Sequence, residues 1–254
     1  MARQVSQRTA VSPDIQARGS DVTISTRYLN DPTASRYGLR VMLVTVSPSS
    51  YSLTVDDIRR SGQPSAIFAA VERPGSDLVL VNGAFFGTDD GQRFYPLGLL
   101  INGSKRLNVI KNWKSGGVLF CTRDLPARIA PISAFAESRD IVEAVQSKPI
   151  LVENSRNGIR AENHEWANRT AVALRNENTL IVAGAFAPGN KAISLYEFAE
   201  ILCRPLSEGG AAAEWALNMD GGPGAHISVP AAHLQLGSEG STFVTNIIRL
   251  SVRR

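Results

Sequence analysis

The chain has 254 residues, of which 43% are hydrophobic and 20% charged, a composition typical of water-soluble globular proteins. This length fits one large domain, and no apolar run approaches the roughly 18 residues needed to cross a bilayer, which excludes a transmembrane helix. The net charge of +4 is spread along the chain without a basic block interleaved with aromatic residues, a pattern that does not favour a nucleic-acid-binding protein.

The first 20 residues are rich in Arg, Gln and Ser and contain little apolar material. They predict a flexible N-terminal arm, followed by a single domain over residues 21–254. The arm lacks the apolar stretch of a signal peptide, so this sequence predicts no export signal.

Alternating and β-branched segments predict most of the secondary structure. Single strands are expected at Val22 to Tyr28, at Leu39 to Val46 and at Asp77 to Val81. Hairpins are expected for Leu99 to Ile101 with Ser104 to Val109 around Asn102-Gly103, for Gly117 to Thr122 with Leu125 to Ile129, and for Thr170 to Leu174 with Thr179 to Val182. Hairpin connections make the neighbouring strands antiparallel.

Two helices are expected among these strands. Ser194 and Glu197 have the spacing of a capping box ahead of an apolar face, which predicts a helix that begins after Ser194. A second helix is expected over Ser138 to Val145, with Asp140 and Glu143 near its start. The predicted fold is α+β: a single domain with a large, mostly antiparallel or mixed twisted sheet flanked by a few helices.

A polar cluster is predicted where the alternating segment Trp215 to Asp220 meets Gly221-Gly222. As a strand, this segment would place Asn218 and Asp220 on one face, beside glycines that let a ligand approach the backbone. A carboxylate and an amide in that position could bind a polar ligand. The alternative is an Asx turn at Asp220-Gly221 without a ligand.

Two other segments resemble binding elements. Asn82-Gly83 ends a predicted strand ahead of Phe85 and Phe86, which could stack on a sugar ring or simply fill the core. Arg169 begins a predicted strand and could hold a phosphate with two hydrogen bonds, or form a surface ion pair.

Five motifs with these residues occur in order along the chain: Asn82 to Phe86, Pro96 to Gly103, Ala144 to Val152, Arg169 to Ala173 and Leu217 to Gly222. Together they resemble the phosphodiester glycosidase family, which contains the uncovering enzyme of lysosomal glycoproteins, over roughly Leu78 to Ile227. Ala183 stands where the family usually has an acidic residue, and Pro223 to His226 replace a usual glycine and serines. Asn112 to Phe120 resembles bacterial members.

The resemblance implies a hydrolase that cleaves between the anomeric carbon of a sugar and a phosphodiester, in a phosphorylated glycan or glycoconjugate such as an exopolysaccharide. It also implies a periplasmic or extracellular location. The further substrate-binding candidates are Asn82, Gly83, Phe85, Phe86, Gly98, Gln146, Ser147, Thr170, Asn218, Gly221 and Gly222.

The expected chemistry assigns three catalytic roles. Arg169 would stabilise the charge of the leaving phosphate. Asp220 would act at an oxocarbenium-like transition state, either as the nucleophile that attacks the anomeric carbon or as the base that activates water. His226 could act as a general base or acid, or be structural. The sequence does not identify a second carboxylate.

Alternatives from other classes remain open at this stage. A protein that binds glycans without turnover would tolerate Ala183, and a phosphodiesterase would cleave the P–O bond instead. No cofactor and no metal site is expected, because neither nucleotide-loop nor metal-ligand spacing occurs, although Asp220 could join a hard-cation site. Cys121 and Cys203 could form one disulfide or remain free thiols.

Overall fold

A computed structural model describes residues 9–11, 15–16, 22–25, 27–29, 38–47, 51–59, 71–176, 179–237 and 244–253. Within these residues the strands form three larger sheets and two ribbons, and the pairings are antiparallel, as predicted. No helix within the described residues is long and apolar enough to cross a membrane.

The largest sheet has eight strands. In spatial order they are β16 (Arg156–Asn157), β15 (Ile150–Glu153), β19 (Trp215–Asn218), β17 (Arg169–Leu174), β18 (Leu180–Phe186), β5 (Arg40–Val46), β3 (Val22–Ser25) and β2 (Ile15–Gln16). The predicted strands at Leu39 to Val46 and Trp215 to Asp220 and the third predicted hairpin lie here. The predicted strand from Val22 to Tyr28 is divided between β3 and β4 (Arg27–Leu29), and β4 pairs with β1 (Thr9–Val11).

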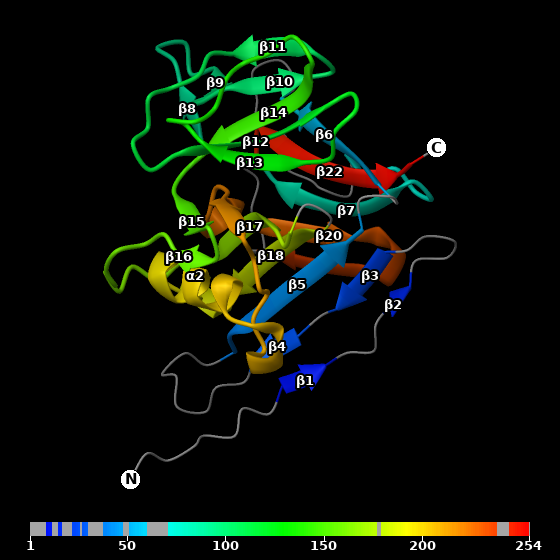
Figure 1. Ribbon diagram of the computed structural model, residues 1–254, viewed down its shortest axis with the longest axis vertical. Coiled ribbons are helices and arrows are strands. Elements are labelled where there is room, and N and C mark those ends of the chain that lie inside the picture. The colour runs from blue at the N-terminus through cyan, green and yellow to red at the C-terminus, as the bar shows by residue number, and fades with distance from the viewer. Residues whose placement is uncertain are drawn as a thin grey trace.

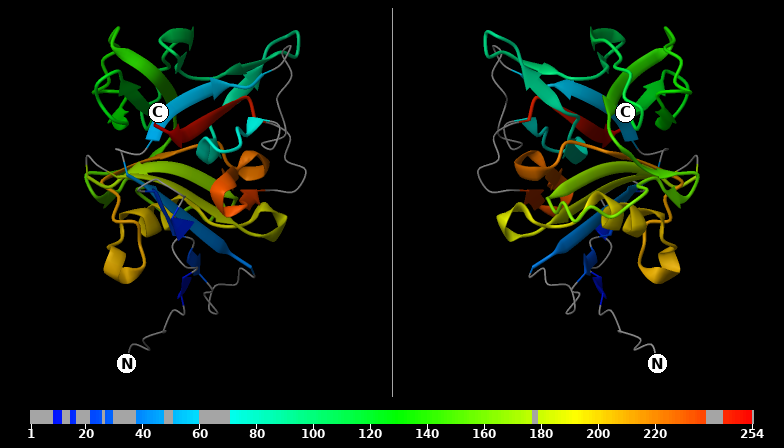
Figure 2. Two further views of the ribbon diagram at one scale, coloured as in Figure 1. Left: turned by 90° about the vertical axis from the view of Figure 1, so that its right-hand side faces the viewer. Right: turned by 90° about the vertical axis from the view of Figure 1, so that its left-hand side faces the viewer.

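Two five-stranded sheets cover one face of the eight-stranded sheet (Figures 1 and 2). The β7 sheet contains β21 (Leu234–Gly237), β20 (His226–Val229), β7 (Asp77–Asn82), β22 (Asn246–Val252) and β6 (Tyr51–Asp57). The β14 sheet contains β11 (Lys105–Asn108), β10 (Leu100–Asn102), β14 (Ile141–Ser147), β12 (Gly117–Thr122) and β13 (Arg128–Pro131). A ribbon of β8 (Phe86–Thr88) and β9 (Phe94–Pro96) stands beside them.

The other face of the eight-stranded sheet is covered by α2 (Leu195–Cys203) (Figure 1). Ser194 accepts a hydrogen bond from the Glu197 amide, and the Glu197 carboxylate accepts one from the Ser194 amide, so the predicted capping box is confirmed. Short 3-10 turns occupy Pro188–Asn190, Leu206–Glu208, Gly222–Gly224 and Pro230–Ala232. The fold is therefore dominated by several sheets, and the expectation of one large sheet flanked by a few helices is corrected.

The predicted helix over Ser138 to Val145 is wrong, because this segment contributes to β14. The strand pairs with β10 on one side and β12 on the other, and nearly all of its side chains are buried. Glu143, expected near a helix start, instead accepts hydrogen bonds from the amides of Val55 and Gly103, and so joins β14 to β6 and to the β10–β11 turn. A central strand that is buried on both faces lacks the alternation of apolar and polar residues that marks a half-buried strand.

The other two hairpins are confirmed. Gly103 and Ser104 have φ of 55° and 67°, the paired positive values of a tight two-residue hairpin turn. In the second hairpin the return strand begins at Arg128, three residues later than predicted, because the Leu125 amide bonds to Thr122 Oγ1 and Pro126 has no amide to donate.

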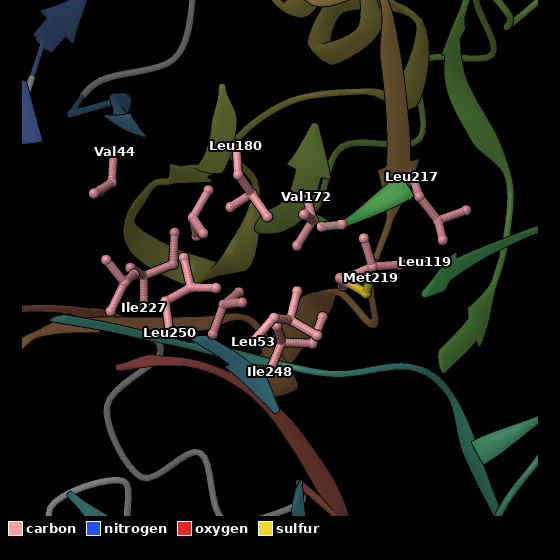
Figure 3. Close-up of a cluster of buried hydrophobic side chains, with 14 of the residues drawn as sticks. Val44, Leu53, Leu119, Val172, Leu180, Leu217, Met219, Ile227, Ile248 and Leu250 are labelled. Atoms are coloured by element: carbon pink, nitrogen blue, oxygen red, sulfur yellow. The ribbon is translucent and has the colours of Figure 1, made fainter. Parts of the chain in front are cut away.

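The main core fills the space between the eight-stranded sheet and the two five-stranded sheets. Figure 3 shows Val172 and Leu217 from the first sheet facing Leu53 and Ile248 from the β7 sheet. A second cluster, which includes Ala183 and Phe198, joins the eight-stranded sheet to α2. Both faces of this sheet are buried, so side chains can reach solvent mainly where its strands end.

Of the predicted N-terminal arm, residues 9–11 and 15–16 form β1 and β2, and the rest lies outside the described residues. Cys121 and Cys203 are both free, the first buried and the second partly buried, so of the two alternatives the structure has free thiols.

Candidate active site

The chain that follows β19 is held between two sheets. The Asp220 amide donates to the Gly83 carbonyl at the end of β7 (3.0 Å), and the Met219 amide donates to the Thr170 carbonyl of β17 (2.9 Å). The Gly222 amide then donates to the Asn168 carbonyl (2.8 Å). Asp220 therefore lies at the junction of the β7 sheet and the eight-stranded sheet.

Asn82 is the central side chain of this junction. Its Nδ2 donates to the backbone oxygens of Asp220 (2.6 Å) and Gly83 (3.3 Å). Its Oδ1 accepts from Thr170 Oγ1 (2.7 Å) and from the His226 amide (3.0 Å). All four bonding positions of the amide are occupied, so Asn82 acts as a positioning residue. We call Asn82, Thr170, Asp220 and His226 the Asn82 cluster.

The Asp220 carboxylate is partly buried in this cluster. Its Oδ1 accepts a hydrogen bond from the Gly221 amide (2.9 Å), whereas Oδ2 has no hydrogen-bond donor among the described residues. Burial raises the pKa of Asp220 from 3.8 to about 6, against the smaller lowering effect of the Gly221 amide. Near neutral pH the group is an ionised carboxylate whose proton affinity is close to that needed for acid–base or nucleophilic chemistry.

Arg169 lies beside the turn that follows Asp220. A Cβ placed on Gly221 would lie 3.5 Å from Nη1 of Arg169 and 2.9 Å from the Asn168 carbonyl, so glycine permits this close approach. The guanidinium donates from Nη2 to the Glu165 carbonyl (2.9 Å) and forms no ion pair with a carboxylate of the described residues. Burial lowers the pKa of Arg169, opposed by the charge of Glu165, but an arginine stays protonated.

His226 is held by its backbone in the Asn82 cluster. A Cβ at Gly237 would lie 2.3 Å from its Nδ1, so the imidazole packs directly on the glycine of the neighbouring strand β21. Burial lowers the pKa of His226 from 6.5 to about 4, and the charge of Glu72 opposes this effect. The ring is therefore neutral at pH 7, which fits a general base better than a proton donor.

Asn218 lies with Ala216 on the face of β19 toward α2, whereas Leu217 and Met219 face the main core. The alternation of the predicted strand is confirmed, but both faces are covered. Asn218 Nδ2 donates to the carbonyls of Lys148 (3.0 Å) and Met219 (2.7 Å). Its buried Oδ1 has no partner among the described residues, and the same holds for Oγ of Ser147.

Gln146 and Gly98 form a separate structural contact. Gln146 Oε1 accepts from the amides of Leu99 (3.0 Å) and Lys111 (2.8 Å), and its Nε2 donates to the Lys111 carbonyl (2.6 Å). A Cβ on Gly98 would lie 2.9 Å from Gln146 Oε1. These two substrate-binding candidates hold the β14 sheet to the following loop.

The remaining candidates follow β7, except for Gly222, which follows β19. Gly83 is buried, and a Cβ there would lie 1.8 Å from Oδ1 of Asn246. Phe85 and Phe86 are partly exposed, and Phe86 makes an edge-to-face contact with Phe94 at 5.6 Å between ring centroids. Gly222 adopts φ of 64° at the start of a 3-10 turn.

Three asparagines that the sequence did not single out support the site. Asn246 Oδ1 accepts from the Ala84 amide, Asn168 Oδ1 accepts from the Ala187 amide, and Asn190 Oδ1 accepts from the Asn168 amide. Asn168 and Asn246 lie where strands begin. An asparagine at the end of a strand was the signal that identified Asn82, and an asparagine at the start of a strand is a comparable signal. Ala183, in contrast, packs within the cluster against α2. No group of three or more His, Cys, Asp and Glu side chains that could hold a metal gathers among the described residues.

Similar folds occur among solved structures. The catalytic domain of zebrafish N-acetylglucosamine-1-phosphodiester alpha-N-acetylglucosaminidase, auto-inhibited by its pro-peptide, matches with a TM-score of 0.65 at 16% identity, over 98% of this chain and 89% of that one. A hypothetical protein from Synechocystis matches with a TM-score of 0.60 at 16% identity over 91% of this chain, which spans only 62% of that protein's chain. A putative exported protein from Burkholderia pseudomallei matches with a TM-score of 0.56 at 11% identity, over 84% of this chain and 74% of the other.

At sequence level, no curated protein matched the chain. The model of the phosphodiester glycosidase family matches residues 77–246, from the first residue of β7 to the first residue of β22. Because this match contains the whole Asn82 cluster and extends over more than half of the sequence, the chain belongs to the phosphodiester glycosidase family.

Proposed function

We propose that this protein hydrolyses the bond between the anomeric carbon of a sugar and a phosphodiester oxygen, with Asp220 as the catalytic carboxylate. The observation that carries the proposal is that the side chains of Asp220 and Arg169 both lie next to Gly221, and that Oδ2 of Asp220 has no hydrogen-bond donor among the described residues. Family membership supports a glycosidase-type hydrolase.

Arg169 supports the departure of the phosphate. A phosphate monoester that leaves an anomeric carbon is a weak base and needs little protonation, but its negative charge must be stabilised. The half-buried guanidinium has no carboxylate partner among the described residues, so its charge is available to an anionic ligand. Bond cleavage then leaves an oxocarbenium-like sugar next to Asp220.

Asp220 and His226 complete the reaction. The Asp220 carboxylate either attacks the anomeric carbon or stabilises its positive charge while water attacks. Water adds its oxygen to the sugar, one proton is accepted by a base such as the neutral His226, and the products are a free sugar and a phosphomonoester.

The test is release of free sugar from a panel of glycosyl-1-phosphodiesters by the purified protein. Asp220→Asn keeps the side-chain size and the hydrogen bond to Gly221 but removes the charge, and Asp124→Asn on the exposed β12–β13 turn is the matched control. The proposal requires turnover by the wild type and the control, and at least a hundredfold loss in Asp220→Asn. Equal turnover in both variants would refute the role of Asp220.

A further inference from the structure

Lysine is rare in this protein, and its distribution is uneven. The chain has five lysines; Lys111 and Lys114 lie in the loop between β11 and β12, and Lys148 directly follows β14. All three are exposed. We call these lysines, together with Trp113, the lysine rim.

Backbone contacts fix the shape of the rim. Gln146 bonds both the amide and the carbonyl of Lys111, and the Ile150 amide donates to the Ser115 carbonyl (2.8 Å). The loop is thereby attached to β14 on one side and to β15 on the other. The Lys148 ammonium lies 5.2 Å from the centroid of the Trp113 ring, a cation–π contact that holds its charge over the loop.

The rim adjoins the proposed active site. Asn218 donates from its backbone amide to the Pro149 carbonyl and from its side chain to the Lys148 carbonyl, both at 3.0 Å. Asp220 is only two residues further along the same chain. The Lys148 backbone is therefore the neighbour of the segment that leads from β19 into the catalytic turn.

None of the three ammonium groups forms an ion pair with a carboxylate of the described residues. Through Trp113, the Lys148 ammonium is held against the loop that carries Lys111 and Lys114, and an anionic ligand at this loop can be attracted by all three charges. The only aromatic ring of the rim is engaged with Lys148, which leaves little surface for the base stacking that single-stranded nucleic acids use.

We propose that the lysine rim binds the anionic continuation of a polymeric substrate, a glycan whose repeating units are joined by phosphodiesters. The inference rests on the proposed function for the position of the cleaved bond. It specifies that the substrate carries phosphates beyond the one that is cleaved, and that these phosphates contact Lys111, Lys114 and Lys148.

Binding is measured separately from turnover. The ligands are a synthetic tetramer of N-acetylglucosamine 1-phosphate repeats and the methyl phosphodiester of a single N-acetylglucosamine 1-phosphate, each titrated by calorimetry into Asp220→Asn so that neither is consumed. The comparison is repeated with Lys111→Gln, Lys114→Gln and Lys148→Gln combined in the same background. Lys105→Gln, an exposed lysine on β11, is the matched control.

We expect the tetramer to bind more tightly than the single unit, and the triple variant to lose about tenfold of tetramer affinity, since one exposed ion pair contributes a factor of roughly two to five. The single unit and the Lys105→Gln control should be unaffected. The affinity difference should shrink as salt rises from about 50 to 500 mM. If the wild-type protein shows no turnover but these differences in tetramer affinity are observed, the lysine rim is supported as a binding surface and the proposed reaction is refuted.

Two results would overturn the inference while leaving the proposed reaction intact. One is equal affinity for tetramer and single unit in the presence of sugar release by the wild type. The other is equally tight binding of an oligothymidylate with the same number of phosphates, lost to the same extent in the triple variant, which would make the rim a nucleic-acid surface.

Discussion

The side-chain amide of Asn82 donates to the backbone carbonyl of Asp220 across 2.6 Å, although 138 residues separate the two in the chain. Asn82 ends β7, and Asp220 follows β19, so this bond joins two different sheets. The same amide accepts from Thr170 and His226. The geometry around Asp220 therefore depends on the packing of the β7 sheet against the eight-stranded sheet.

Replacing Asn82 by Ala should destabilise the protein and abolish activity. The substitution removes the hydrogen bonds of Asn82 to the Asp220 carbonyl, the Thr170 hydroxyl and the His226 amide, at a cost of about 3 kcal/mol. Urea unfolding of the variant measures this cost. An unfolding free energy within 0.5 kcal/mol of wild type, roughly the effect of an ordinary surface substitution, would contradict the positioning role.

Replacing Gly83 by Ala should displace Asn246. The new Cβ would lie 1.8 Å from Asn246 Oδ1, which accepts the Ala84 amide, so we expect a loss of about 3 kcal/mol or more. The double variant Gly83→Ala with Asn246→Ala should be less destabilised than the sum of the two single variants, because the clash is removed. Strict additivity in thermal unfolding would show that the two residues do not interact.

The stability effect of Asp220→Asn should depend on pH. The pKa of Asp220 is raised in the fold to about 6 from 3.8, so its stabilising contribution is complete below pH 3.8 and is lost as pH rises through 6. Asn is not ionised, and Asp220→Asn should therefore gain on the order of 2 kcal/mol relative to wild type between pH 4 and pH 8. Chemical unfolding at both pH values measures the difference, and a gap independent of pH would exclude a raised pKa.

The activity itself should fall in acid. If ionised Asp220 is required, kcat/KM should decline below pH 6, the pKa of this carboxyl. His226 has its pKa near 4 and is already neutral there, so His226→Gln should lower the rate without moving this limb. A limb that moves or disappears in His226→Gln would assign the titration to the imidazole.

The sequence identified those parts of the site whose signals are local. Asn82-Gly83 and Asn218 to Gly222 combine a strand end, an amide or carboxylate and glycines, and the structure brings Asn82, Thr170, Asp220 and His226 together. Asn246 escaped notice because its partner Ala84 is 162 residues away, and only the pairing of β22 with β7 brings them into contact. Long-range pairing of this kind leaves no periodic trace in the sequence.

The sequence predicted the hairpins of the fold correctly, but it did not predict that the strands are divided among several sheets. Turn residues such as Gly103 determine local antiparallel pairs, but nothing local distributes strands among separate sheets. Buried β14 was mistaken for a helix because the apolar residues Ile141, Val142, Ala144 and Val145, with acidic residues nearby, have a spacing that also fits one face of a helix. Gln146 bonds the backbones of Leu99 and Lys111, which lie 35 or more residues away in the sequence, so these contacts could not be predicted from the sequence.

The central claim concerns which bond is broken, and hydrolysis in water enriched in oxygen-18 tests it most directly. The ligand is a glycosyl-1-phosphodiester that the protein turns over, and both products are analysed by mass spectrometry. Cleavage at the anomeric carbon places the label in the released sugar and leaves the phosphomonoester unlabelled. Label in the phosphate would show attack at phosphorus and would contradict a glycosidase built around Asp220.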